Sequence, residues 1–176
     1  MSRSAEQPTA LIVMAPVRGG AEQSVLALLA ALPSGPDSPF ARVRTTHFAR
    51  VLLIPALSDE HGEPVSPAQA YLLFTADFDG PLEQWAATAA REIGADLDRV
   101  FEHCERYPGS RDPSAFLHFI DEHRVAAGFS IIAYRASVAA VRESLELARE
   151  LRGFAVASQG LGASELASAW RERFAG

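Results

Sequence analysis

Four polar side chains that could carry out acid–base chemistry lie in two short, largely apolar segments of the 176-residue chain. His47 and Arg50 belong to the segment Arg44–Ile54, and Asp77 and Asp79 belong to the segment Tyr71–Gly80. Both segments are rich in aliphatic and aromatic residues and adjoin polar stretches, which predicts two β-strands. If the two strands are neighbours in one sheet, the four side chains can meet at one end of it. An imidazole, a guanidinium and two carboxylates suit general acid–base catalysis with stabilisation of an oxyanion.

The imidazole of His47 is the strongest candidate for a general base, because an unperturbed histidine titrates near neutral pH. Side chains alternate along a strand, so His47 and Arg50 should face opposite sides of the sheet. Either residue can therefore line a cavity directly, and both can do so only if a β-bulge intervenes. The alternative is that the His47 ring bonds a loop carbonyl at the end of the strand.

The charged neighbours of His47 have structural explanations as well. An unpaired buried guanidinium costs several kcal/mol, on the order of 3 or more. We therefore expect Arg50 to pair with Asp77 or Asp79 on the adjacent strand. Asp79 precedes Gly80-Pro81 and is well placed to cap the following helix by accepting backbone N–H bonds. Asp77 is then the carboxylate best able to assist His47.

A second candidate is His103, which stands beside the single cysteine, Cys104, at the end of a predicted helix. His103 could ligate haem, or it could stabilise the helix C-terminus as a cation. Cys104 falls on the apolar stripe of that helix, which favours core packing over nucleophilic use. The other histidines are interpreted as surface residues: His61, His118 and His123. No HExxH or His-x-x-x-His pattern occurs, so we predict no metal site.

Composition restricts the classes of function. Hydrophobic residues make up 48% and charged residues 22% of the chain, as is typical of a globular protein of one domain. The net charge of -6 disfavours general binding of nucleic acids. All 16 basic residues are Arg, so Schiff-base chemistry on lysine is excluded. We find no signal-peptide core and no run of the roughly 20 apolar residues that cross a bilayer, so we expect no membrane association and a cytoplasmic location.

Hydrophobic periodicity predicts the elements that would position these residues. In addition to the two strands already described, strands are expected at 9–17 and 128–134. Helices are expected at 21–32, 81–94, 96–104, 112–120 and 137–153, with one more at 164–174. The glycines at 94 and 153 are expected to end their helices.

The resulting order is β-α-β-β-α-(α-α)-β-α. Without the inserted helices it is βαββαβ, the ferredoxin-like unit, so the predicted class is α+β with an antiparallel sheet. We divide the chain into a flexible N-terminus at 1–8, an α+β domain at 9–153 and an extension with a short helix at 154–176. Helices would cover one face of the sheet. The other face would be a large apolar patch, which a homodimer would cover.

Short motifs add a resemblance to known proteins. They are Pro8-Thr-Ala-Leu, Thr46-His-Phe-Ala-Arg50, Phe78-Asp-Gly-Pro81, and His103-Cys104 with Tyr107-Pro108. With the order of elements, they resemble the dimeric α+β barrel superfamily and, between residues 8 and 152, a bacterial family of uncharacterised proteins. The superfamily includes antibiotic-biosynthesis-type monooxygenases, polyketide cyclases, muconolactone-isomerase-like proteins, and haem-binding dye-decolourising peroxidases and chlorite dismutases. The resemblance implies a fold but does not select one activity.

Three functions remain open. The first is an enzyme of secondary metabolism that acts on a small, largely apolar molecule by oxygenase, cyclase or isomerase chemistry, without a predicted cofactor. His47 would be its acid/base, and Arg50 or Asp77 would orient it or bind an oxyanion. Aromatic residues would line its cavity, although such residues more often pack in a core: Phe48, Phe74, Phe78, Trp85 and Tyr134. The second is a haem-binding, peroxidase-like protein with His47 or His103 as axial ligand. The third is a non-catalytic module that binds a ligand or a partner.

Overall fold

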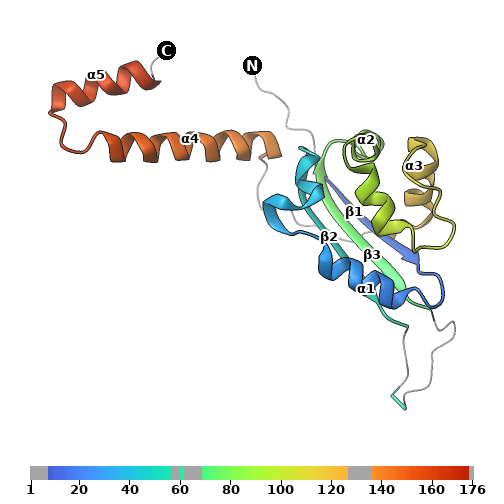
Figure 1. The fold of residues 1–176 in the computed structure, drawn as a ribbon. Helices are drawn as coiled ribbons and strands as arrows, with labels where there is room; N and C mark the ends of the chain where they lie inside the picture. Colours follow the sequence, from blue (N-terminus) through green and yellow to red (C-terminus); the bar gives the residue numbers. More distant parts are fainter. Residues whose placement is uncertain (1–7, 57–59, 62–68, 127–135, 175–176) are drawn as a thin grey trace. The chain divides into compact units, whose positions relative to one another are not determined.

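The computed structural model describes residues 8–56, 60–61, 69–126 and 136–174 (Figure 1). The chain separates into two units, Met1–Val138 and Ala139–Gly176. The division lies after Val138, so the long helix of the C-terminal region groups with the last helix. The division expected from the sequence places that long helix in the domain of the sheet instead.

The first unit is a three-stranded antiparallel sheet with helices. Its strands are β1 (Pro8–Pro16), β2 (Thr46–Ile54) and β3 (Tyr71–Asp79). Its α-helices are α1 (Glu22–Ala31), α2 (Leu82–Phe101) and α3 (Pro113–Glu122), and two short 3₁₀ helices span Gly35–Asp37 and Pro39–Arg42. The predicted α+β class with an antiparallel sheet is therefore confirmed.

The strand order is β1-β3-β2, so the hairpin β2–β3 packs against β1 through β3. At the other edge of β1, Met14 N–H donates to the His123 carbonyl and Val125 N–H donates to the Ile12 carbonyl, both at 2.9 Å. These two bonds form an antiparallel bridge between Val13 and Arg124. The predicted strand at 128–134 lies outside the described residues.

Strict alternation along the strands builds the core. Leu11, Val13 and Ala15 of β1 are buried, whereas the residues between them are only partly buried. On β3 the buried set is Leu72, Phe74, Ala76 and Phe78. These side chains pack against helices α1, α2 and α3, which gather on one face of the sheet (Figure 1). Burying a side chain such as Leu or Phe contributes roughly 1.5–3 kcal/mol, so packing on this face stabilises the unit.

The two helices expected at 81–94 and 96–104 form α2, which is interrupted by a kink next to the glycine expected to end the first of them. The backbone departs from helical geometry at Ile93 (φ -135°, ψ 25°), and the helix bends there and runs on to Phe101. Gly94 follows the bend, and a Cβ built on it would lie 2.7 Å from Ser110 Oγ. The glycine therefore adjoins the predicted break and also permits close packing against the loop before α3.

The start of α3 agrees with the prediction from Asp112-Pro113. Asp112 Oδ1 accepts backbone N–H bonds from Ser114 at 2.9 Å and from Ala115 at 3.2 Å. Pro113 occupies the first turn, where its missing N–H leaves no bond unmade.

The second unit contains α4 (Val138–Ala157), whose first residue belongs to the first unit, and α5 (Ala163–Phe174). The expected end of α4 at Gly153 is wrong, because the helix runs four residues further and Gly153 has nothing within 4 Å of a built Cβ. The expected helix at 164–174 is confirmed. Among the described residues, no helix is both long and apolar enough to span a membrane.

Candidate functional site

His47 lies in a β-bulge at the start of β2. Thr46 pairs with Phe78 and Phe48 pairs with Asp77, so two steps along β2 match one step along β3. Thr46 is buried, and its Oγ1 accepts a hydrogen bond from Trp85 Nε1 at 3.0 Å, so it faces the helices. Phe48 and Arg50 are exposed on the opposite side of the sheet. The bulge thus breaks the alternation at His47.

The bulge brings the His47 imidazole to a carboxylate. His47 Nε2 lies 2.9 Å from Asp79 Oδ1, and the two side chains are only 14% and 9% exposed. By alternation, Asp79 shares the side of Asp77, so this contact places the imidazole on that side as well. We call this side of the sheet, away from α1, α2 and α3, the far face. A β-bulge was the condition under which His47 and Arg50 could share a face of the sheet, and the bulge at His47 meets it.

Asp79 is fixed by a second contact. Its Oδ2 accepts the backbone N–H of Val138, the first residue of α4, at 2.8 Å. The predicted role of Asp79 as cap of the following helix is wrong, because α2 begins after Pro81 without a side-chain capping bond. It is Asp79, not Asp77, that contacts His47.

Arg50 and Asp77 are both exposed on the far face. The guanidinium carbon of Arg50 lies 5.1 Å from the ring centroid of Phe48, a cation–π contact. No ion pair joins Arg50 to Asp77 or Asp79 in the part of the chain that the structure describes, so that expectation is wrong. The reason is that Arg50 is not buried. An exposed guanidinium remains hydrated and needs no carboxylate.

The rest of the far face is largely apolar. Its partly exposed side chains are Ile12 and Met14 of β1, Tyr71 and Leu73 of β3, and Leu52 and Ile54 of β2. In the register of the sheet, Met14, Leu73 and Leu52 form one cross-strand row. The adjacent row is Ile12, Thr75 and Arg50. The far face therefore combines an apolar floor with a polar end at His47 and Asp79.

The predicted aromatic cavity residues separate into two groups. Phe74, Phe78 and Trp85 are fully buried between sheet and helices. Phe78 and Trp85 stack at 4.8 Å between ring centroids, and Phe74 and Trp85 at 6.0 Å. Both phenylalanine rings therefore contact Trp85, as core residues do. Phe48 is 47% exposed on the far face, and Tyr134 lies outside the described residues.

His103 lies at the other end of the sheet from His47. The His103 carbonyl accepts the backbone N–H of Arg18, which follows the end of β1. His47 is at the opposite end, because its neighbour Thr46 and Thr9, near the start of β1, both pair with Phe78. A nine-residue strand spans about 27 Å, so one haem could not bind both histidines. His103 Nε2 lies 3.8 Å from Glu102 Oε1 after the last turn of α2.

Cys104 is a core residue, as its place on the apolar stripe indicated. It is 2% exposed, and burial raises the pKa of its thiol to about 12. Such a thiol is not a nucleophile near neutral pH.

The remaining histidines take no part in the site. His61 and His118 are exposed, as expected. The interpretation of His123 as a surface residue is wrong, because it is partly buried, its Nδ1 lies 2.9 Å from the Phe119 carbonyl, and its ring packs on Phe119. Over the described ranges, no three His, Cys, Asp or Glu side chains are grouped as a metal site would require.

Two features of the site were missed from the sequence. The bulge at His47 carries no glycine to mark it, and the partner of Asp79 is 59 residues away in the chain.

Comparison of the chain with protein-family models, with curated proteins and with solved structures finds no match.

Proposed function

We propose that this protein is an enzyme that acts on a small, largely apolar molecule, with His47 as the general acid/base and Asp79 as the residue that orients it. The observation that carries the proposal is the 2.9 Å contact between His47 Nε2 and Asp79 Oδ1 at the polar end of the far face. A carboxylate that holds one ring nitrogen fixes the orientation of the imidazole and stabilises the cation that forms when it takes a proton.

The far face suits a substrate with an apolar body and one acidic proton. The body would lie on Phe48 and Ile12, the large apolar far-face side chains that the register places closest to His47 and Asp79. The acidic C–H or O–H would point toward His47, which removes the proton and leaves the electron pair on the substrate oxygen. The guanidinium of Arg50 would stabilise this oxyanion, because charge-assisted hydrogen bonds strengthen as negative charge develops. Isomerase, cyclase and oxygenase reactions can all begin in this way.

We further propose that the first unit completes a ferredoxin-like sheet and pairs its far face with that of a second copy, as in a dimeric α+β barrel. The order β1-β3-β2 is the order that βαββαβ topology requires for its first three strands. The bridge between Val13 and Arg124 places the chain antiparallel to β1 just before the predicted strand at 128–134. Pairing of two far faces would remove the apolar floor from water and enclose a substrate.

The test is a search for ligands followed by turnover. A thermal-shift screen of aromatic polyketides and related enolisable compounds, with flavin and haem included, would identify compounds that stabilise the protein. Consumption of each hit would then be followed by mass spectrometry for the wild type, His47→Gln and Asp79→Asn. His118→Gln is the matched control, because His118 is exposed on α3.

We expect His47→Gln to lower the turnover number by about 10²- to 10⁴-fold, as loss of a general base does. Asp79→Asn should lower it less and leave the affinity for the hit nearly unchanged. His118→Gln should behave like the wild type. Undiminished turnover in His47→Gln would refute the assignment of the base. A haem Soret band that His103→Ala abolishes and His47→Gln does not would instead favour a haem protein.

A further inference from the structure

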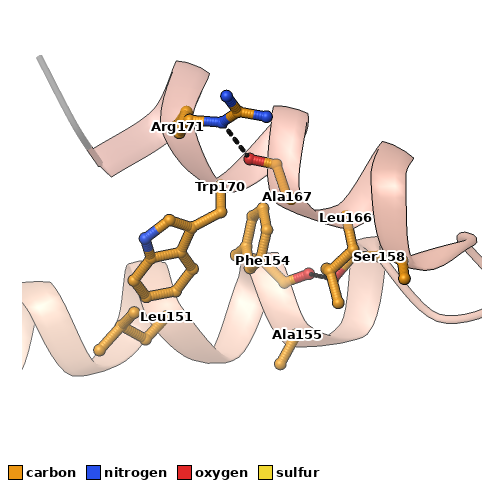
Figure 2. Close-up of a pocket in the computed structure, with 9 residues that line it drawn as sticks. Leu151, Phe154, Ala155, Ser158, Leu166, Ala167, Trp170 and Arg171 are labelled. Carbon is orange, nitrogen blue, oxygen red and sulfur yellow. Dashed lines mark hydrogen bonds between the residues drawn. The ribbon is translucent and has the colours of Figure 1, made fainter.

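The second unit is a helical hairpin with an apolar groove along it. Figure 2 shows α4 and α5 side by side, with side chains of both helices directed into the space between them. The groove has a volume of about 840 Å³ and is lined by Leu151, Phe154, Ala155, Ser158, Ala163, Leu166, Ala167, Trp170 and Arg171. Phe154, Trp170 and Phe174 hold the hairpin together, with ring centroids 4.6–5.6 Å apart.

The groove exposes large apolar side chains. Trp170 is 47% exposed and Leu166 is 40% exposed, although both point into the groove. Within the described part of the chain, α5 has no buried residue and α4 has only Val138. In proteins most of the stability of a helix comes from packing its apolar face against another element. An exposed apolar groove of this kind is typical of a surface that binds another protein element.

The shape of the groove favours helices over a small molecule as its occupant. A small-molecule site surrounds most of its ligand, about 70–90% of the ligand surface. Two helices supply two walls and leave the opposite side of the groove open. A second pair of helices would close that side and produce a four-helix bundle, in which each helix contacts two neighbours.

The distribution of bulk along the groove fits a second copy of the same hairpin. Trp170 and Leu151 lie at one end of the groove, whereas Leu166 and Ser158 lie at the end near the loop (Figure 2). Ala163 also adjoins that loop. A two-fold axis perpendicular to the groove places Trp170 of one copy over the small residues Ser158 and Ala163 of the other. Such an interface is self-complementary, as a two-fold dimer requires.

Acidic and basic residues lie at opposite ends of the groove, so antiparallel pairing of two hairpins brings opposite charges together. Between Gly153 and Trp170 the only charged residue in the sequence is Glu165, near the loop. Arg152 and Arg171 belong to the opposite end, and Arg171 lines the groove there. Antiparallel pairing brings these guanidinium groups near Glu165 of the second copy and near the partial negative charge at the C-terminus of its α4. Residues 139–176 contain five Arg and five Glu, so two hairpins approach without net repulsion.

We propose that the groove between α4 and α5 is the surface through which two copies of this chain associate, forming an antiparallel four-helix bundle. The proposal is independent of His47, and it concerns a different surface from the far face of the sheet.

The test is the mass of the full-length protein in solution. Sedimentation equilibrium would be run between about 1 and 100 µM, a range that covers typical dissociation constants of weak to moderate dimers. The proteins are the wild type and each variant named below, with and without Leu73→Arg, which removes pairing of the far faces. Ala167→Arg places a long cation in the groove, and Ser168→Arg places the same side chain at the next position of α5, which is exposed and does not line the groove. Arginine is compatible with a helix at both positions, and circular dichroism would check that the hairpin is retained.

With pairing of the far faces removed by Leu73→Arg, we expect the otherwise wild-type protein and its Ser168→Arg variant to be dimers. Ala167→Arg in the same background should raise the dissociation constant at least 10-fold, that is by about 1.4 kcal/mol. Arg171→Glu should weaken the dimer by roughly 3- to 10-fold. Adding Glu165→Arg makes the pair complementary again but removes the bond that Glu165 Oε2 accepts from the Gly162 N–H at 3.0 Å, so it should restore part of the loss.

Three results would overturn the proposal. One is equal dissociation constants for Ala167→Arg and Ser168→Arg. Another is a dimer that survives Ala167→Arg and is lost in Leu73→Arg, which would assign the interface to the far face. The third is a wild-type protein that stays monomeric throughout this concentration range. If that monomer then sediments with phosphatidylglycerol vesicles, the groove binds a lipid surface instead of a second copy.

Discussion

Cys104 and Tyr107 are two weakly acidic residues whose pKa values are raised in the folded protein. Burial raises the pKa of the Cys104 thiol to about 12. The pKa of the Tyr107 hydroxyl is raised as well, first by burial and then by its hydrogen bond to Asp98 Oδ1 at 2.8 Å. The Tyr107 ring also stacks on Phe101 at 5.7 Å between centroids. Ionisation of either group would put a charge into the packing around the end of α2.

The sign of the resulting pH dependence follows from these directions. A folded-state pKa above the unfolded value means that the folded protein binds more protons at high pH, so the free energy of unfolding falls as pH rises. For Cys104 the stabilising contribution is complete below the ordinary thiol pKa of 9.0 and is lost as pH rises toward 12. We expect urea denaturation to give a lower unfolding free energy at pH 10.5 than at pH 8, with a smaller difference in Cys104→Ala/Tyr107→Phe. An unchanged pH dependence in the double variant would contradict this account.

At the scale of elements, the bend of α2 depends on the absence of a side chain at Gly94. A Cβ there would approach Ser110 Oγ to 2.7 Å, which is closer than side-chain contacts allow, and Ser110 is itself buried. The same Cβ would lie 3.6 Å from Ser110 Cβ, which is an ordinary contact. The clash therefore comes from one hydroxyl oxygen.

This geometry predicts opposite effects of one substitution in two backgrounds. Gly94→Ala should lower the free energy of unfolding by about 1–2 kcal/mol in the wild type, because Ser110 must shift. In Ser110→Ala the oxygen is gone, and Gly94→Ala should be neutral or stabilise the helix by up to about 1 kcal/mol. Urea denaturation of the four proteins gives the double-mutant cycle. Equal effects in both backgrounds would show that Ser110 is not the obstacle.

The elements show which features local pattern could predict. The strands at 46–54 and 71–79 were predictable from their apolar runs, and the start of α3 from Asp112-Pro113, because these signals act within a few residues. The interruption of α2 beside Gly94 was predictable in the same way. The end of α4 was not, because the helix continues through Gly153, where no neighbour crowds the backbone. His47 was identified as the candidate base, but its carboxylate partner was not, because a bulge changed its face.

At the scale of the whole molecule, the two units differ in what holds them together. The first unit contains the buried core around Phe74, Trp85 and Phe101, whereas α5 has no buried residue among those described. Each unit contains one tryptophan, Trp85 in the core and Trp170 in the groove. Fluorescence of single-tryptophan variants can therefore follow the two units separately.

We expect the two units to unfold in separate transitions, with the hairpin first. Urea denaturation would be followed by Trp170 emission in Trp85→Phe and by Trp85 emission in Trp170→Phe, with far-UV circular dichroism of the wild type as the common reference. The midpoint for Trp170 should lie at a lower urea concentration, because the unfolding free energy follows the apolar area withdrawn from water. The circular dichroism curve should then span both transitions, since α4 and α5 supply much of the helix. Coincident curves from all three signals would mean that the chain unfolds as one cooperative unit.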